Sequence, residues 1–221
     1  MKNILVVAPH ADDETLGCGA TLLKHISKGD RVHWLLCSSM NESYSQEKRA
    51  QRSSEIQQVI KRYPMTSSKQ LKLPPATLDL LSQSTIISEM YGYVQSTKPS
   101  IVYIPYRNDA HNDHQQVFDA ILACCKSFRS PFVSKILMYE TLSETDFALK
   151  PEDPGFKPNC YEDITEFLDE KLNILTIYES ELAPFPFPRS VEAIRALAQV
   201  RGVQSGCMAA EAFMIIKEIN R

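Results

Sequence analysis

The sequence lacks any long uninterrupted run of apolar residues. No stretch of its 221 residues approaches the roughly 20 apolar residues that a helix needs to cross a bilayer. The apolar residues 4–8 are also too few for the core of a secretory signal peptide, which takes about 7–15. We therefore expect a protein with no transmembrane segment and no secretion signal.

The sequence also lacks an excess of positive charge. It has 24 Lys and Arg against 27 Asp and Glu, a formal net charge of -3. Proteins that bind nucleic acid usually gather basic residues on one surface, whereas the densest basic stretch here, residues 47–52, mixes them with Glu and Gln. This stretch is typical of a solvated helix face, so nucleic acid is not an expected partner.

The cysteines lack the spacing of a disulfide framework or of a metal-binding C-x-x-C pair. There are six of them: Cys18, Cys37, Cys124, Cys125, Cys160 and Cys207. Unpaired cysteines are typical of proteins in a reducing compartment. We therefore expect free thiols and a cytoplasmic location.

Apolar runs and helical patterns alternate along the chain. Continuous apolar runs at residues 4–8, 32–37, 101–104 and 135–139 predict strands that are buried on both faces of a parallel sheet. Further strands are expected at residues 70–73 and 212–219, and helices at 16–26, 45–63, 85–97, 113–128, 164–178 and 191–201. This alternation predicts an α/β fold with a mostly parallel sheet flanked by helices. Without a repeat or a linker, residues 1–221 are expected to form a single domain.

A dense polar cluster follows the first predicted strand. Residues 9–14 read Pro-His-Ala-Asp-Asp-Glu, at the end of a strand where open α/β sheets bind ligands. Helix capping accounts for one or two of these acids, but not for His10 or for three adjacent carboxylates. A divalent metal ion would balance their mutual repulsion, so the cluster indicates a metal site.

A nucleotide-binding turn is the alternative for this segment, because residues 17–19 read Gly-Cys-Gly after a strand. In a dinucleotide fold the glycines form the turn that holds the pyrophosphate. Here carboxylates occupy that turn and the glycines lie inside the predicted helix. The glycines are therefore expected to allow close helix packing.

A second polar cluster follows the strand at residues 101–104. It contains two of the five histidines, His111 and His114, which are three residues apart and project to one side of a helix start. Asp113 lies between them and is expected to orient one imidazole ring. The other three histidines are His10 and two without such neighbours, His25 and His33, which are assigned no role.

The two clusters together offer the ligands of a catalytic zinc ion, which binds three N or O side chains and leaves one position open. Asp12 and Asp13 are consecutive, so their side chains diverge and only one of them is expected to bind the metal. The other is then a candidate general base. Spacing alone leaves open which aspartate takes which role.

The two motifs resemble the signatures PHxDDE and HxDH of the PIG-L/LmbE-like family of zinc-dependent N-acetylglucosaminyl deacetylases. The first motif has Ala11 where the family usually has proline, and the second, residues 111–114, matches fully. Residues 52–55 resemble the RxxE helix of the family, and residues 201–202 and 210–213 resemble its C-terminal signature. The resemblance implies a Rossmann-like, LmbE-like fold over the whole chain.

The resemblance also implies roles for the first cluster. It makes His10, Asp13 and His114 the ligands of Zn²⁺, and it makes Asp12 the general base that removes a proton from water. Glu14 is expected to be structural and to hold the turn between strand and helix.

In the second cluster, the resemblance makes His111 the group that stabilises negative charge on the acyl oxygen, with Asp113 tuning it. Arg52 resembles a family arginine that contacts the substrate. The implied activity is removal of an N-acetyl group from a small, sugar-containing molecule by attack of a metal-activated water.

Two other functions remain open at this point. The same residues would serve an amidase that cleaves a larger N-acyl conjugate, or a catalytically idle sugar-binding protein that kept its metal. The sequence does not identify the substrate or the oligomeric state. The proline-rich residues 184–188 either line the rim of the pocket and offer Arg189 to an anionic group, or form a stiff surface loop that packs Phe185 and Phe187 inward.

Overall fold

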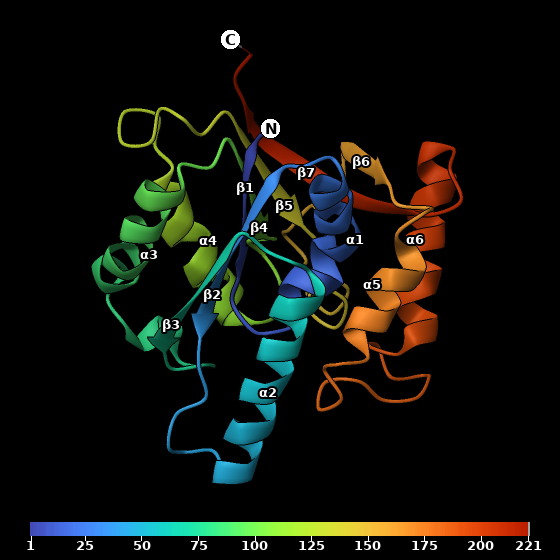
Figure 1. Ribbon diagram of the computed structural model, residues 1–221, viewed down its shortest axis with the longest axis horizontal. Coiled ribbons are helices and arrows are strands. Elements are labelled where there is room, and N and C mark those ends of the chain that lie inside the picture. The colour runs from blue at the N-terminus through green and yellow to red at the C-terminus, as the bar shows by residue number, and fades with distance from the viewer. Residues whose placement is uncertain (221) are drawn as a thin grey trace.

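Seven strands form one sheet in the computed structural model, which describes residues 1–220 (Figure 1). Their order across the sheet is β3-β2-β1-β4-β5-β7-β6. The strands are β1 (Asn3–Ala8), β2 (Arg31–Ser38), β3 (Ser67–Leu73), β4 (Ile101–Pro105), β5 (Lys135–Tyr139), β6 (Cys160–Asp163) and β7 (Ala210–Glu218). The first five in chain order are parallel, and β7 is antiparallel to both β5 and β6. The predicted mostly parallel α/β sheet is confirmed.

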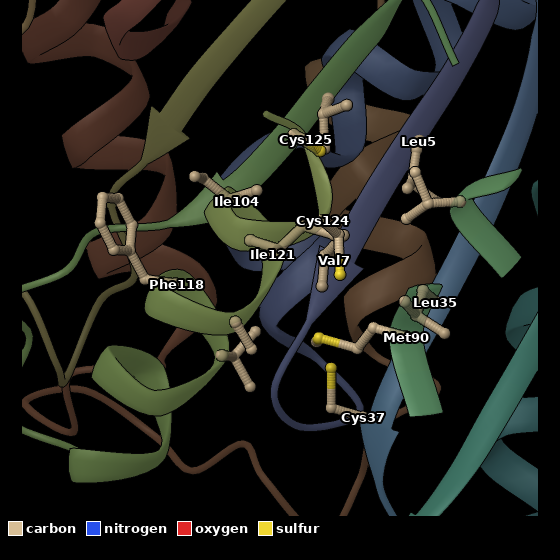
Figure 2. Packing of buried hydrophobic residues seen from close by; sticks show 14 of the residues in the cluster. Leu5, Val7, Leu35, Cys37, Met90, Ile104, Phe118, Ile121, Cys124 and Cys125 are labelled. Carbon is tan, nitrogen blue, oxygen red and sulfur yellow. The ribbon is translucent and has the colours of Figure 1, made fainter. Parts of the chain in front are cut away.

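The central strand β1 is buried on both faces because its alternate side chains enter two different cores. Leu5 and Val7 lie in one apolar cluster, while Ile4 and Val6 lie in another. Figure 2 shows the first of these clusters, in which β1, β2 and β4 meet the side chains of a helix that includes Phe118. A strand with no solvent-exposed face needs a continuous apolar sequence, which is what residues 4–8 provide.

Helices cover both faces of the sheet (Figure 1). Helices α3 and α4 lie on one face and α1, α5 and α6 on the other. Helix α2 starts away from the body of the protein, and its second half packs Ile56 and Val59 into the core on the α1 side. The helices are α1 (Asp13–Ser27), α2 (Gln46–Arg62), α3 (Gln83–Thr97), α4 (Asn112–Cys124), α5 (Leu168–Leu175) and α6 (Val191–Ser205), with a short 3₁₀ helix η1 (Leu78–Leu80). Among the described helices, none is both long and apolar enough to cross a membrane.

Two helices are shorter than predicted. The helix expected at residues 113–128 ends at Cys124, whose carbonyl accepts a hydrogen bond from the Ser130 hydroxyl at 2.8 Å. The helix expected at residues 164–178 starts only at Leu168, because the Ile164 amide donates to the Ala209 carbonyl and continues the sheet. The preceding strand, β6, was not predicted, since its polar sequence at the edge of the sheet carries no apolar run.

The topology brings the two polar clusters together. Strands β1 and β4 are neighbours, with Ile4 opposite Ile101 and Val6 opposite Tyr103. The chain goes from β1 to β2 on one side and later returns to β4 on the other side, so the strand order reverses between β1 and β4. In such sheets a crevice opens beyond the carboxyl ends of these two strands, where the two motifs lie.

Candidate functional site

The turn after β1 has an unusual backbone at Asp12. Its φ is 139°, a conformation that residues with a side chain rarely adopt and that is often found at functional sites. The Asp12 carbonyl accepts the amides of Thr15 and Leu16 at 2.9 and 2.8 Å, and its own amide donates to Glu14 Oε2 at 3.2 Å. These contacts hold the turn so that Asp12 and Asp13 point in different directions.

Glu14 holds this turn from within the core. Its side chain is fully buried, and its Oε1 accepts hydrogen bonds from the Thr15 and Tyr178 hydroxyls at 2.6 and 2.8 Å. Burial raises the pKa of Glu14 to about 7, although these hydrogen bonds oppose the rise. The contacts agree with the structural role expected for Glu14.

Three of the predicted residues converge on one point between β1 and β4. The two imidazole nitrogens His10 Nδ1 and His114 Nε2 each lie 3.4 Å from Asp13 Oδ2. Two ligands of a tetrahedral zinc ion with bonds of about 2.0 Å lie about 3.3 Å apart. Moreover, His114 Nε2 is buried without a hydrogen-bond partner among the described residues. The donor set and its spacing therefore fit a zinc ion.

Two further carboxylates orient these histidines. Asp109 Oδ2 lies 2.7 Å from His114 Nδ1, and Asp113 Oδ2 lies 3.0 Å from His10 Nε2. Each contact turns the opposite ring nitrogen toward Asp13, as is usual for histidines that bind metals. No role was predicted for Asp109 from the sequence. The signal that could have found it is its position five residues before His114, between β4 and α4.

Burial lowers the pKa of His111 and the negative charge of Asp113 opposes this shift, and the predicted tuning of His111 by Asp113 stays a prediction. The sequence did not predict that the Asp113 carboxylate also contacts His10 and accepts the amides of Ala76 and Leu78 at 2.7 and 3.1 Å. The reason is that β1 and β4 are adjacent, so the start of α4 faces the turn after β1. Only the backbone amide of Asp113 contacts His111, by donating to its Nδ1 at 3.1 Å.

A second group of possible ligands shares His10 with the first. It consists of His10, His111 and Asp113. Both oxygens of Asp113 already accept backbone amides, from Ala76 and Leu78, whereas His114 Nε2 in the first group has no partner among the described residues. The group of His10, Asp13 and His114 therefore fits a metal better.

Neighbouring charges and hydrogen bonds shift the pKa values of His10 and Asp13. Burial lowers the pKa of His10, but hydrogen bonds with Asp113 and Asp13 outweigh it and raise this pKa to about 9. Burial also disfavours the charged form of Asp13, yet the charge of His114 and the hydrogen bond with His10 hold the pKa of Asp13 well below its usual range. Protons on the two histidines thus balance Asp13, and metal binding would displace them.

Asp12 and His111 lie beside the three candidate ligands, and their pKa values shift in opposite directions. Burial and the negative charge of Asp13 raise the pKa of Asp12 to about 7. Burial and the nearby His10 lower the pKa of His111 to about 4, so that its ring is neutral at pH 7. Asp12 Oδ2 has no hydrogen-bond partner among residues 1–220.

A cavity of about 280 Å³ opens at this site. His10, Asp12, Asp13 and His111 line one part of it, and segments from β2, α2 and the loop before α6 line the rest. The other wall residues are Ala11, Ser38, Ser39, Met40, Tyr44, Arg52, Ile56, Gln70, Pro75, Ala76, Glu144, Glu181 and Arg189.

Arg52 lies in the wall of this cavity and is almost fully engaged there. Its Nη1 donates to the Ala11 carbonyl at 2.6 Å, and its Nη2 donates to the Ser180 hydroxyl at 3.0 Å and pairs with Glu181. Its Nε lies 3.2 Å from a carboxylate oxygen of Glu55. These contacts tie α2 to the turn after β1, and substrate contact by Arg52 stays a prediction.

The proline-rich segment before α6 places Arg189 at the cavity. Arg189 Nη1 lies 3.6 Å from Asp12 Oδ2, and its Nη2 lies 3.3 Å from Glu181. Phe185 is 66% exposed. The alternative of a surface loop that packs both Phe185 and Phe187 inward is therefore wrong, and Arg189 belongs to the wall of the site.

Gly17 and Gly19, which follow the first motif, let neighbouring side chains pack closely against α1. A Cβ atom on Gly17 would lie 2.1 Å from Tyr139 Cδ2, and one on Gly19 would lie 2.4 Å from the Tyr63 hydroxyl. Such separations are far below van der Waals contact. The prediction that these glycines permit close approach is confirmed.

Comparison with known proteins identifies the family. Residues 5–125 match the family model described as PIG-L: GlcNAc-PI de-N-acetylase. The chain belongs to this family. Both motifs, and with them all the candidate metal ligands, lie in the matched segment.

A curated relative supports the PIG-L assignment. The chain is 26% identical over 185 residues to the uncharacterized deacetylase YaiS of Escherichia coli, which spans 81% of this chain and 91% of the relative. The family and this relative make the chain a member of a deacetylase family.

Solved structures share the PIG-L fold. The conserved protein TT1542 of Thermus thermophilus matches with a TM-score of 0.79 and 24% identity, covering 100% of this chain and 97% of its own. The N,N'-diacetylchitobiose deacetylase of Pyrococcus horikoshii matches with a TM-score of 0.77 and 21% identity, covering 98% and 84%. A hydratase, GalB of Pseudomonas putida, also matches, with a TM-score of 0.77, 16% identity and coverage of 100% and 98%. The fold alone therefore does not fix the reaction.

Proposed function

We propose that this chain is a zinc-dependent hydrolase that removes the N-acetyl group of a small, sugar-containing substrate. We further propose that residues 1–221 form a single domain of the PIG-L family, which one sheet with strands from both halves of the chain supports. The observation that carries the proposed activity is the spacing of His10 Nδ1, Asp13 Oδ2 and His114 Nε2 beside a cavity that His10 and Asp13 line.

These three side chains would hold the metal, and Asp113 and Asp109 would fix the two rings. Zinc bound there supplies Lewis acidity at an amide carbonyl and makes water easier to deprotonate. The remaining steps belong to side chains of the chain itself.

Asp12 is the proposed general base. Asp12 lines the cavity together with Asp13, and its Oδ2 has no hydrogen-bond partner among the described residues. It is therefore available to accept a proton from the attacking water and to pass it to the leaving amine. Asp13 is engaged by His10 and His114, which favours the division of roles that the resemblance implies.

His111 is the proposed donor to the acyl oxygen. Its Nδ1 accepts the amide of Asp113 at 3.1 Å, so a neutral ring carries its proton on Nε2. An N–H group held in this way by the start of a helix is in place before negative charge develops on the oxygen. The contact with Asp113 thus fixes the tautomer of His111.

The size of the cavity favours a small substrate with an acetyl group. Its volume of about 280 Å³ lies just below the usual range of ligand pockets, about 300–1,000 Å³. A long acyl chain would need more space. The deacetylase relatives, one of which acts on N,N'-diacetylchitobiose by its name, support an N-acetylated sugar or sugar conjugate.

The test compares zinc content with acetate release for wild type and variants, on a panel of N-acetylated sugars and conjugates. His10→Ala, Asp13→Ala and His114→Ala should lose both zinc and activity. Asp12→Asn should keep zinc and lose about 10²–10⁴-fold in rate, the usual cost of removing a general base. Chelator treatment should abolish activity, and added zinc should restore it.

Asp119→Asn is a matched control, because Asp119 lies on α4 but pairs with Arg107 on the surface. It should keep both zinc and rate. An Asp12→Asn protein without zinc, or one that works at the wild-type rate, would show that the two aspartates are wrongly assigned. Zinc binding without acetate release from any substrate would favour the sugar-binding alternative.

A further inference from the structure

Helix α1 is broken one turn after the first motif. Cys18 has φ −146° and ψ 18°, which is not helical, although helical structure continues on both sides. In an unbroken helix the amides of Ala20 and Thr21 would donate to the carbonyls four residues earlier, those of Leu16 and Gly17. The break therefore calls for other partners for these backbone groups.

Two distant residues supply those partners. Glu211 of β7 accepts the amides of Ala20 and Thr21 at 3.1 and 2.7 Å. Lys171 of α5 donates from Nζ to the Leu16 carbonyl at 2.8 Å. Glu211 thus satisfies two backbone amides after the break, and Lys171 satisfies a backbone carbonyl before it.

These two residues also form a buried ion pair. Lys171 Nζ lies 2.7 Å from Glu211 Oε1, and both side chains are 4% exposed. A buried ion pair is stable only when further hydrogen bonds satisfy its atoms. Here the backbone of α1 provides these hydrogen bonds, so the pair and the broken helix stabilise each other.

Leu16 connects the ion pair to the candidate site. Its carbonyl accepts from Lys171, and its amide donates to the Asp12 carbonyl at 2.8 Å. One residue therefore separates the pair from the turn that carries Asp12 and Asp13. At the break itself, Gly17 packs against the ring of Tyr139 with no space for a Cβ atom.

We propose that the Lys171–Glu211 pair is a splint across the break in α1, and that it positions the turn formed by residues 12–17. The two residues are positioning residues, because they act on Asp12 and Asp13 through the backbone. Because of the break, the first turn of α1 need not be collinear with the rest of the helix, and the splint fixes its orientation. The part of the inference that concerns metal binding rests on the proposed function.

The test uses the double variant Lys171→Met/Glu211→Gln, which removes both charges together and so leaves no unpaired buried charge. The control is Arg201→Met/Glu140→Gln. This second pair is also largely buried, with an Nη2 to Oε2 distance of 2.6 Å, but within residues 1–220 neither side chain hydrogen-bonds to α1. Both variants are expected to lose stability, so thermal unfolding alone does not distinguish them.

Two measurements distinguish a splint from a merely stabilising pair, each made well below the unfolding temperature. The first is hydrogen exchange at the amides of Thr15 and Leu16 in metal-free protein. The second is the Kd for zinc, measured by competition with a chelator. In the double variant, exchange should be faster and zinc binding about tenfold or more weaker, as for loss of groups that orient metal ligands. The control should match the wild type in both.

Unchanged exchange at Thr15 and Leu16 in the folded double variant would overturn the splint. A wild-type protein that binds no zinc would overturn the proposed function instead, and the exchange measurement would still decide the splint. If the double variant does not fold, Glu211→Gln replaces it. This variant keeps one oxygen acceptor and loses the other, so exchange should still be faster near the break.

Discussion

Replacing Asp109 by alanine removes the carboxylate that orients His114. Asp109 is 1% exposed, and its Oδ2 lies 2.7 Å from His114 Nδ1. Its Oδ1 accepts the hydroxyl of Thr145 at 2.6 Å, which holds the carboxylate in place. In Asp109→Ala the His114 ring loses its partner at Nδ1, and nothing then favours the tautomer that leaves Nε2 free for a metal.

The expected magnitude follows from the position of this contact. Loss of a group that orients a metal ligand typically weakens metal binding about 10–100-fold, which corresponds to about 1.4–2.8 kcal/mol. Because His114 is fully buried and water does not replace the lost carboxylate easily, Asp109→Ala should lie near the upper end. Asp109→Asn should lie near the lower end, since its amide oxygen still accepts from Nδ1.

The assay is competition for zinc between each variant and a chromogenic chelator, with circular dichroism to confirm folding. Asp119→Ala is the control, because Asp119 binds Arg107 at 2.9 Å on the partly exposed side of α4. It should leave the zinc Kd unchanged. An Asp109→Ala protein that folds and binds zinc as tightly as the wild type would refute the role of Asp109.

Three further outcomes are expected. Gly17→Ala should destabilise the protein by about 1–3 kcal/mol in urea unfolding, because overpacking against Tyr139 costs this much. The control is Gly92→Ala, which should not destabilise the protein because a Cβ atom there meets nothing within 4 Å. Tyr178→Phe should lower the free energy of unfolding by about 1 kcal/mol through loss of its hydrogen bond to Glu14, with zinc retained. All six cysteines are free and should react with a thiol reagent after denaturation without reductant, as the sequence predicts for a protein of a reducing compartment. Fewer reactive thiols in fresh protein would contradict that expectation.

The sequence predicts the site best where a motif directly follows an apolar strand of the parallel sheet. Residues 4–8 and 101–104 are continuous apolar runs, and parallel strands of this kind end at the same edge of a sheet. The two motifs follow directly, so their meeting was predictable without coordinates. Distances within one motif, such as that between His111 and His114, also follow from helix geometry.

Contacts between distant segments were not predictable in this way. Asp113 contacts His10 because the start of α4 faces the turn after β1, and no local pattern encodes which side chains meet there. Among the described residues, the polar strand β6 pairs with a single strand, β7, and its sequence shows no strand signal of its own. Glu211 satisfies amides 190 and 191 residues earlier in the chain, which no spacing rule anticipates.

The contacts of Lys171 and Glu211 with α1 join residues that are far apart in the sequence, so they form only late in synthesis. The turn with Asp12 and Asp13 is synthesised early, but Lys171 and Glu211 follow Leu16 and Thr21 by 155 and 190 residues. At about 5–20 residues per second, translation covers that second interval in about 10–40 s. In the later part of this time a nascent chain already contains His10, Asp13 and His114 but still lacks Glu211. The candidate metal ligands are therefore made first, and one of the groups proposed to hold the turn of Asp12 and Asp13 is made almost last.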